Sequence, residues 1–399
     1  MRPNHPPFRP LGYWPPSMKQ AATRTPTRGA ALVGMAAVLV VVAFGAAVLL
    51  PGVAGGKAEK PDAPGNLVIE KQGSLFAGGT VITAPGTFDP TNPTTAGQTL
   101  HVDHVYAQYQ IPPNARNLPL VMWHGCLSTA WESTPDDREG YGPIFVRRGW
   151  SVYIIDQPRQ GRAGKSSEGI TITPTPGENA SFNSWRLGIW PNFFPGVQFP
   201  RDPASLDHFW RQGGAAHGPG SQTLSTDGVA ALFARIGPGV LVTHSASGIL
   251  GWLTAMKSPN VKAIVAYEPS NYVFPEGEVP PALPLFNGTP LSPGNTVSMS
   301  DFLKLTRIPI QMVFSDGIPT SPNPVISRDN WRLRLIYAGQ LVDAINRHGG
   351  DATLLHLPDI GIHGNTHFAF SDLNNVQIAD LMSRFLHDKT LDKRGNAKH

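Results

Sequence analysis

The feature that most constrains the fold of this chain is a series of short apolar runs that do not alternate with polar residues. Strands of this kind are buried on both faces, as in a parallel sheet that helices cover on either side. The six runs are residues 118–123, 150–156, 239–243, 261–268, 308–314 and 352–357. Helical periodicity is present over residues 227–236, 248–257, 331–349 and 374–388. The sequence therefore predicts an α/β fold with a mostly parallel central sheet, right-handed crossovers and flanking helices.

Two segments ahead of these runs have a different pattern. Residues 67–84 and 101–111 alternate between apolar and polar side chains, which predicts antiparallel strands that open the sheet. Farther along, 82 residues separate Asp156 from Gly239, where a simple crossover unit takes about 30. We therefore expect an insertion at about residues 160–225, ahead of the strand that begins at Gly239.

The insertion is rich in aromatic residues. Seven of the thirty residues from 183 to 212 are aromatic: Trp185, Trp190, Phe193, Phe194, Phe199, Phe209 and Trp210. They could line an apolar cleft under a lid, or they could form a core that holds the insertion onto the domain. Both interpretations remain open from the sequence. Near its start, we expect Asp156 and Arg159 to fix the loop that follows their strand.

The positive charge of the chain is concentrated at its N-terminus. Residues 1–56 contain five basic residues and no acidic one, and the remainder contains 27 basic and 28 acidic residues. The formal charge of +4 therefore does not indicate a nucleic-acid surface, and we exclude nucleic acid as a partner.

The basic arm over residues 1–28 leads into residues 29–50, which carry no charge and could cross a bilayer as a helix. The arm predicts that the N-terminus stays in the cytoplasm and that the rest of the chain is exported. Small residues at 52–54 leave a cleaved secretory signal open as the alternative to a membrane anchor. The protein would then be secreted or periplasmic, and otherwise anchored with its main domain outside the cytoplasm.

The remaining boundaries follow from composition. We expect a polar linker over 51–66, one domain over 67–388 and a polar C-terminal tail over 389–399. Cys126 is the only cysteine of the chain, so an internal disulfide is excluded.

A candidate nucleophile lies in residues 243–248, Thr-His-Ser-Ala-Ser-Gly, which join a buried run to a helical pattern. A strand followed at once by small–x–Ser–x–small and a helix is typical of a nucleophile elbow. The backbone comes close to its neighbours two positions before and two after the nucleophile, so small residues are required there. Around Ser245 these positions hold Thr243 and Ser247. Around Ser247 they would include the branched Ile249, so Ser245 is the candidate nucleophile.

A reactive serine needs a general base, which in such sheets follows the last strand. The loop after residues 352–357 contains His363 and His367. Their spacing of four could suit a metal site on a helix, but the Gly-Asn pair between them argues against a helix and no further ligand cluster completes a zinc site. His367 precedes Phe-Ala-Phe, a pattern common after the base in serine hydrolases of this architecture. We therefore prefer His367 over His363 as the base and expect no metal.

The base needs an orienting acid, for which two residues compete. The acid usually stands two residues beyond the first Asp after the penultimate strand, and that position here is Ile318, after Asp316. The preceding strand instead ends in Glu268, at the sheet edge where open α/β sheets assemble their sites. We therefore predict Glu268 as the acid, with Asp316 as the alternative. Along the chain, Ser245, Glu268 and His367 follow the order nucleophile, acid, base that serine hydrolases with this kind of sheet share.

Two backbone N–H groups are expected to form an oxyanion hole. Ala246, just after the candidate nucleophile, would donate the first, and Cys126 or Leu127 the second, from the His-Gly-Cys-Leu loop after residues 118–123. Cys126 as the nucleophile is the weaker alternative, because nothing after it resembles an elbow.

Taken together, these motifs resemble a small family of bacterial esterases within the α/β-hydrolases, over most of residues 67–388. The stretches that carry the resemblance are HGCLSTAWESTPDDREGY (124–141), VYIIDQPRQGR (152–162), THSASGIL (243–250), IVAYEPS (264–270) and GIHGNTHFAFSDLNN (361–375).

The resemblance implies an α/β-hydrolase fold with a cap or lid insertion, Ser245 as nucleophile, His367 as base and Glu268 as an acid after the sixth strand. The family's type member has two adjacent cysteines, joined by a disulfide, where this chain has Cys126 and Leu127. The N-terminal span lies outside the resemblance.

The sequence thus predicts a serine-dependent carboxylic ester hydrolase that acts on a small-molecule ester, without cofactor or metal. Two alternatives stay open: a membrane-tethered binding protein that kept the fold without turnover, and an amide or peptide hydrolase with the same residues. The acyl and alcohol groups of the substrate and the oligomeric state are not specified.

Overall fold

The computed structural model describes residues 65–394, and the basic arm, the 29–50 segment and most of the linker lie outside this range. The final five residues of the C-terminal tail also lie outside it. Between residues 65 and 394, no helix combines the length and the apolar character that a membrane crossing requires. The anchor and the signal at 29–50 therefore both stay predictions.

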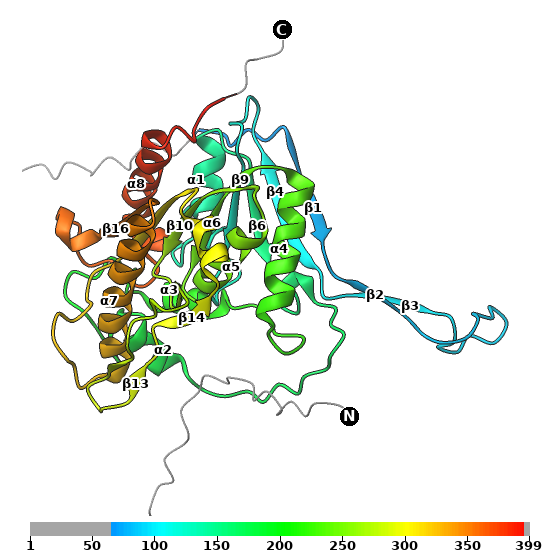
Figure 1. The fold of residues 1–399 in the computed structure, drawn as a ribbon, viewed down its shortest axis with the longest axis horizontal. Helices are drawn as coiled ribbons and strands as arrows, with labels where there is room; N and C mark the ends of the chain where they lie inside the picture. The colour runs from blue at the N-terminus through cyan, green and yellow to red at the C-terminus, as the bar shows by residue number, and fades with distance from the viewer. Residues whose placement is uncertain (1–64, 395–399) are drawn as a thin grey trace, which may run out of the picture. The chain divides into compact units, whose positions relative to one another are not determined.

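Eight strands of the described chain form one central sheet (Figure 1). Neighbouring strands in the sheet are β1 (Lys71–Ala77), β4 (Val105–Ile111), β6 (Val152–Asp156), β5 (Leu120–Trp123), β9 (Gly239–His244), β10 (Val261–Tyr267), β15 (Pro309–Phe314) and β16 (Asp351–His356), in that order. The pairs β1–β4 and β4–β6 are antiparallel, and all the other pairs are parallel. The predicted α/β fold with a mostly parallel sheet is confirmed.

Helices cover both faces of this sheet, and the strand side chains alternate between two cores. Val121 and Trp123 join the core under α4 (Gln222–Ile236), α5 (Ser247–Lys257), α6 (Met299–Leu305) and α7 (Ile326–Arg347). Leu120 and Met122 join the core under α1 (Tyr141–Arg147) and α8 (Asn375–Asp388). Burial on both faces explains why these strands show no polar alternation in the sequence.

The remaining elements are short. They are η1 (Gly161–Ala163), α2 (Glu178–Ser184), β7 (Gly188–Ile189), β8 (Asn192–Phe193), α3 (Pro203–Arg211), β11 (Tyr272–Pro275), β12 (Leu283–Pro284), β13 (Pro290–Leu291), β14 (Gly294–Val297), η2 (Leu357–Ile360) and η3 (Ala369–Ser371). Side-chain caps start the last two helices before β9, α3 and α4: Asp202 accepts a hydrogen bond from the backbone N–H of Ser205 at 2.9 Å, and Ser221 caps α4.

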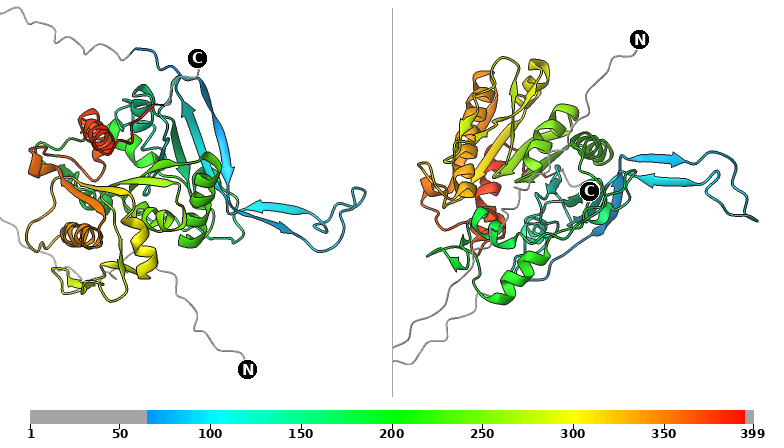
Figure 2. Two further views of the ribbon diagram at one scale, coloured as in Figure 1. Left: turned by 45° about the horizontal axis from the view of Figure 1, so that its top comes forward. Right: turned by 90° about the horizontal axis from the view of Figure 1, so that it is seen from below.

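The two long antiparallel strands expected at the start of the domain are each interrupted. Gly78 and Gly79 have φ angles of 66° and 85°, and Asp103 has a φ of 57°, so the chain bends away from the sheet at all three. Beyond the bend, β2 (Thr80–Thr83) pairs only with β3 (Thr99–Val102) in an antiparallel hairpin. Figures 1 and 2 show this hairpin projecting from the edge of the domain.

The aromatic residues between β6 and β9 mainly pack as a core. Phe199 and Phe209 are buried, and the ring of Phe209 lies 5.1 Å from that of Phe368, in the loop after β16. Trp185 makes a similar contact with Phe368, at 5.1 Å between ring centroids. This packing favours the interpretation in which the aromatics hold the segment onto the domain. A lid function stays a prediction.

Candidate active site

The turn after β9 places Ser245 in a strained backbone conformation. Its φ is 52°, a left-handed value that non-glycine residues rarely adopt. The Ser245 N–H donates to the Tyr267 carbonyl at 3.0 Å, and the Ser245 carbonyl accepts from the N–H of Ser270 at 3.0 Å. Both partners flank Glu268, so the turn is tied directly to the end of β10.

Close backbone approach around this turn requires two glycines. A Cβ atom on Gly125 would lie 2.7 Å from the Ser245 Cβ, and one on Gly248 would lie 2.5 Å from the Pro269 Cβ. Any side chain at either position would push the turn away from the neighbouring strand ends. Gly125 and Gly248 are thus sterically required beside Ser245, in addition to the small residues that the sequence pattern identifies at 243 and 247.

Ser247 has a structural role in the same turn. Its side chain is buried, accepts a hydrogen bond from the His244 N–H at 2.9 Å and lies 2.9 Å from the carbonyl of Trp123. These contacts hold the hydroxyl inside the turn and join β9 to β5. The alternative nucleophile is therefore committed to backbone groups.

Glu268 and His367 form a buried pair across the ends of two strands. The Oε2 atom of Glu268 accepts a hydrogen bond from Nδ1 of His367 at 2.5 Å, and both side chains are at most 1 % exposed. The Oε1 atom accepts from the Ser315 N–H at 2.9 Å. The Nε2 atom of His367 is buried and has no hydrogen-bond partner among residues 65–394. The pair thus leaves the second imidazole nitrogen available as a proton acceptor.

Charge neighbours set the protonation of this pair. Burial by itself would raise the pKa of Glu268, but Arg186 and His367 outweigh it and hold the pKa well below its usual range. Burial lowers the pKa of His367, and the nearby Glu268 only partly offsets this effect. The resting pair at neutral pH is an ionised carboxylate beside a neutral imidazole.

The sequence did not reveal the main counter-ion of Glu268. Arg186 is buried, donates from Nη2 to Oε1 of Glu268, and donates from Nε to the Asp316 carbonyl at 2.9 Å. Its guanidinium lies 5.3 Å from the ring centroid of Trp331. The sequence shows only a basic residue within an aromatic-rich run. Because Glu268 is 82 positions farther along the chain, nothing in the sequence links the two residues.

His244, immediately before Ser245, links the turn to His367. The rings of the two histidines are 4.4 Å apart between centroids, and Nε2 of His244 donates to the His367 carbonyl at 3.0 Å. Burial, together with the proximity of His367, lowers the pKa of His244 well below its ordinary value. A neutral His244 thus fixes the segment of the base without adding charge to the site. No pattern in the sequence indicates this role.

The loop that carries His367 is held by a buried carboxylate. Asp372 accepts hydrogen bonds from the N–H and hydroxyl of Thr366 at 2.7 and 2.8 Å and from the Asn365 amide at 3.0 Å. Burial raises the pKa of Asp372 to about 7, although these hydrogen bonds oppose the shift. Asp372 therefore positions the base rather than taking part in its pair.

The two alternatives, Asp316 and His363, lie together near the surface. Oδ2 of Asp316 is 3.4 Å from Nδ1 of His363, and their side chains are 31 % and 64 % exposed. Asp316 also accepts from the N–H groups of Gly364 and Gly317, at 2.7 and 2.6 Å. The structure therefore brings Glu268 to His367 and leaves Asp316 as a loop-holding residue.

The loop after β5 brings Gly125 against Ser245 and places Cys126 and Leu127 next along the chain. Cys126 is exposed, and the protein atoms around its thiol raise the pKa of the thiol above its ordinary value. A thiol with such a pKa stays protonated at neutral pH and is a poor nucleophile. Ala246 stands at the start of α5, beside the Ser245 turn.

Asp156 and Arg159 do fix the loop after β6, but through other partners than one another. Asp156 accepts from the N–H and Nε of Arg162, both at 2.8 Å, whereas Arg159 donates to Asp103 at 2.7 Å. Burial raises the pKa of Asp156, but His124 and Arg162 outweigh it and bring the pKa to about 2. The expectation of a shared role is corrected to two separate ion pairs.

Residues 65–394 hold no group of three or more His, Cys, Asp or Glu side chains that could bind a metal ion.

Comparisons with known proteins agree with this architecture. A novel bacterial esterase, known at atomic resolution, is 30% identical; the match covers 83% of this chain and all of that one, with a TM-score of 0.66. The probable secreted lipase phiG of a fungal species (strain ATCC 74256) is 26% identical over 308 residues, 70% of this chain and 84% of the lipase. No protein-family model matches the chain. From the shared sheet and this similarity, the chain belongs to the α/β-hydrolase superfamily, among the esterases.

Proposed function

We propose that this protein is a serine-dependent carboxylic ester hydrolase with Ser245 as nucleophile, His367 as general base and acid, and Glu268 as the orienting acid. The observation that carries the proposal is the buried Glu268–His367 pair, whose second imidazole nitrogen has no partner in the described chain. The neighbour of Ser245, His244, touches this imidazole, and Ser245 itself bonds to the residue before Glu268. Ser245, the neutral imidazole of His367 and the ionised carboxylate of Glu268 follow the carboxyl ends of β9, β16 and β10, along one edge of the sheet.

The chemistry follows from these protonation states. Nε2 of His367 takes the proton of the Ser245 hydroxyl as the oxygen attacks the ester carbonyl, and later returns it to the leaving alcohol. Water then attacks the acyl-serine, with His367 again accepting and returning a proton, and the carboxylic acid leaves. Glu268 keeps the Nδ1–H tautomer in place and stabilises the imidazolium that forms twice in each turnover.

The tetrahedral oxyanion needs donors at the point where charge develops. We assign the first to the Ala246 N–H, at the positive end of α5, and the second to Cys126 or Leu127. Gly125 supports this assignment, because its lack of a side chain lets the loop approach Ser245.

Arg186 completes the proposed site as a positioning residue. Its charge keeps Glu268 ionised at the cost of burying a second charged group, and its link to Asp316 ties the acid to the loop after β15. Arg186 does not contact the substrate in this proposal. It acts on the reaction indirectly, by holding Glu268, which in turn orients His367.

The choice of an ester over an amide rests on the two relatives, an esterase and a probable secreted lipase. The assembled pair of Glu268 and His367 gives no support to a binding protein without turnover. We also propose that the domain is exported from the cytoplasm. Residues 1–50 combine a basic arm with an apolar segment, and the lipase relative is described as secreted.

Hydrolysis of a panel of p-nitrophenyl esters, from acetyl to long acyl chains, tests the function. We expect turnover of at least one ester by the wild-type chain and a loss of about 10³-fold or more in kcat for Ser245→Ala. Ser247→Ala is the matched control and should remain active, because its hydroxyl bonds only to backbone groups of the turn. Activity that survives in Ser245→Ala, or that is lost equally in both variants, would contradict the assignment.

A further inference from the structure

A cavity of about 390 Å³ lies beside Arg186, the counter-ion of Glu268. Its lining combines two basic side chains, one acidic side chain and an apolar wall: Arg186, Arg328, Asp316, Phe194, Pro195 and Val197. Neither Ser245 nor His367 lines this cavity. It is therefore separate from the place where the ester reacts in the proposed function.

Each of the two arginines has a buried nitrogen without a hydrogen-bond partner in the described chain. In Arg186 this nitrogen is Nη1, because Nη2 donates to Glu268 and Nε donates to the Asp316 carbonyl. In Arg328 it is Nε, whereas Nη2 donates to the Gly317 carbonyl at 2.9 Å. A buried donor on a charged group costs free energy when it has no acceptor. The cavity thus has two donors for which residues 65–394 supply no acceptor.

The positive charge at this cavity also lacks a complete counter-charge. Burial and the charge of Arg186 both lower the pKa of Arg328, and no carboxylate of the described chain opposes these two effects. The carboxylate of Asp316 accepts instead from the N–H groups of Gly317 and Gly364, at 2.6 and 2.7 Å. An anion between the two guanidinium groups would relieve their repulsion.

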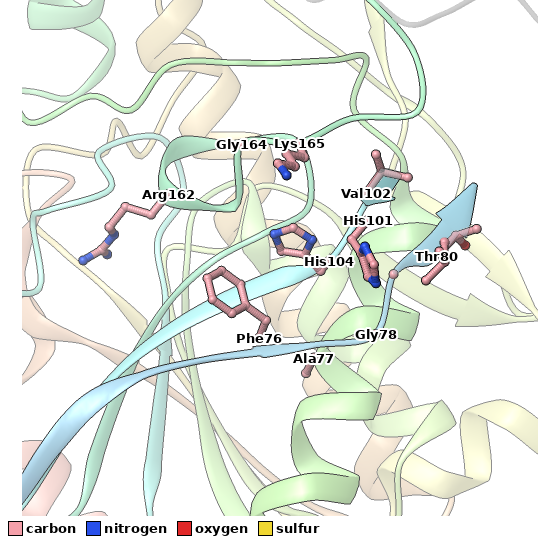
Figure 3. A pocket seen from close by; sticks show the side chains of 12 residues that line it. Phe76, Ala77, Gly78, Thr80, His101, Val102, His104, Arg162, Gly164 and Lys165 are labelled. Atoms are coloured by element: carbon pink, nitrogen blue, oxygen red, sulfur yellow. The ribbon is translucent and has the colours of Figure 1, made fainter. Parts of the chain in front are cut away.

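The larger cavity at the base of the β2–β3 hairpin differs on this point (Figure 3). It has a volume of about 620 Å³ and is also lined by basic side chains, but Nε of Arg162 donates to Asp156 at 2.8 Å. None of the described side chains that line it has a buried polar atom without a hydrogen-bond partner. The unmet donors therefore distinguish the cavity beside Arg186.

The lining of the cavity beside Arg186 selects the kind of anion. The guanidinium of Arg328 lies 5.0 Å from the ring centroid of Phe194, and Pro195 and Val197 extend the apolar wall. A planar carboxylate can accept from two guanidinium donors at once. A sulfate or phosphate would leave further oxygens against the apolar wall. A volume of about 390 Å³ is within the range of small-ligand sites and leaves room for a short alkyl chain.

We propose that this cavity binds a short-chain monocarboxylate, whose oxygens accept from Nη1 of Arg186 and Nε of Arg328 and whose alkyl chain lies against Phe194. The bound anion and Glu268 then share one cation, Arg186. An ester hydrolase releases carboxylates, so occupancy of the site would rise as product accumulates; this link alone rests on the proposed function.

Thermal unfolding of the full chain in a mild detergent tests the site. Sodium butyrate at about 100 mM should raise the Tm of the wild-type chain by about 2 °C or more over sodium chloride of equal ionic strength. The rise should disappear in Arg328→Gln, which removes one of the two donors. Arg201→Gln removes the same charge from an exposed position and should keep the full rise. No rise in the wild type, or an equal rise in wild type and Arg328→Gln, would overturn the proposal.

A photoreactive carboxylate locates the site directly. A pentanoate that carries a diazirine should, after irradiation, leave adducts on residues 194–197, 316–317 or 364–365, as peptide mass spectrometry would show. Excess butyrate should suppress these adducts, and so should Arg328→Gln. Adducts confined to residues 243–248 would place the carboxylate at the candidate active site and refute the separate cavity. Neither measurement uses turnover, so a failure of this site is distinguishable from a failure of the proposed hydrolysis.

Discussion

Replacing Glu268 by Gln tests the assignment of the acid, because the change preserves size and removes one charge. The amide oxygen can still accept from Ser315 and Arg186, but an amide N–H2 then faces Nδ1 of His367, where Oε2 accepted a hydrogen bond. An N–H group can only donate, so His367 must carry its proton on Nε2 and can no longer accept one from Ser245. Loss of the correct tautomer lowers kcat by about 10⁴-fold in serine hydrolases.

The same substitution also has a cost in stability. Arg186 is buried and its ionic partner is Glu268, so the variant leaves a buried cation without its counter-ion. Breaking one partner of a buried ion pair costs about 3–5 kcal/mol, which corresponds to a fall in Tm of roughly 5–15 °C for a domain of this size. We therefore expect Glu268→Gln to be both nearly inactive and less stable.

Asp316→Asn is the matched control for this experiment. Asp316 is partly exposed and accepts from two backbone N–H groups, so the change should cost about 1–2 kcal/mol and leave kcat within a few-fold of wild type. The assay measures kcat of both variants at room temperature, and circular dichroism shows whether each variant is folded. An inactive Asp316→Asn beside an active Glu268→Gln would refute the reasoning.

Three further predictions follow from the site and the N-terminal segment. Burial lowers the pKa of His367 below its ordinary value of 6.5, so the imidazole stays neutral into mildly acidic solution. The acidic limb of the kcat/KM profile should therefore have its midpoint below pH 6.5, and a midpoint above this value would contradict the burial argument. Gly248→Ala should lower kcat and also lower stability by about 1–3 kcal/mol, since the new Cβ would lie 2.5 Å from Pro269. In the control Gly339→Ala the new Cβ meets no atom within 4 Å, so the change should stabilise α7 by up to about 1 kcal/mol. Equal effects of the two variants in thermal unfolding would count against the close approach at Gly248. Protease added to intact spheroplasts should digest the domain, and N-terminal sequencing that begins near residue 55 would identify a cleaved signal in place of an anchor; complete protection would exclude export.

The central sheet was predictable because its strands are buried on both faces. The runs at 239–243 and 308–314 coincide closely with β9 and β15, since burial on both faces keeps most of each strand apolar. The strands 67–84 and 101–111 were predicted as continuous because alternation alone does not show where pairing changes. The chain bends at Gly78–Gly79 and at Asp103. The bend at Asp103 is visible only in the structure, where this non-glycine residue has a left-handed backbone.

The residues of the candidate site could be chosen from the sequence only where a short local stretch identifies them. The small residues around Ser245 and the carboxylate that closes β10 both belong to single short stretches. Arg186 and His244 could not be found in this way, because each acts through a partner that only the folded chain brings near. Asp372 bonds within its own loop, but its burial shows only in the structure. The same limit applies to Arg159, whose partner Asp103 lies 56 positions away, whereas Asp156 pairs with Arg162 in its own loop.

The most direct test of the central claim is the covalent labelling of the nucleophile. A fluorophosphonate should add to the active protein once, and peptide mass spectrometry should place the adduct on Ser245. Labelling should persist in Ser247→Ala, whose hydroxyl is buried in the turn, and disappear in Ser245→Ala. An adduct on Ser247 or Cys126, or ester hydrolysis by a protein that the reagent does not label, would contradict Ser245 as the nucleophile.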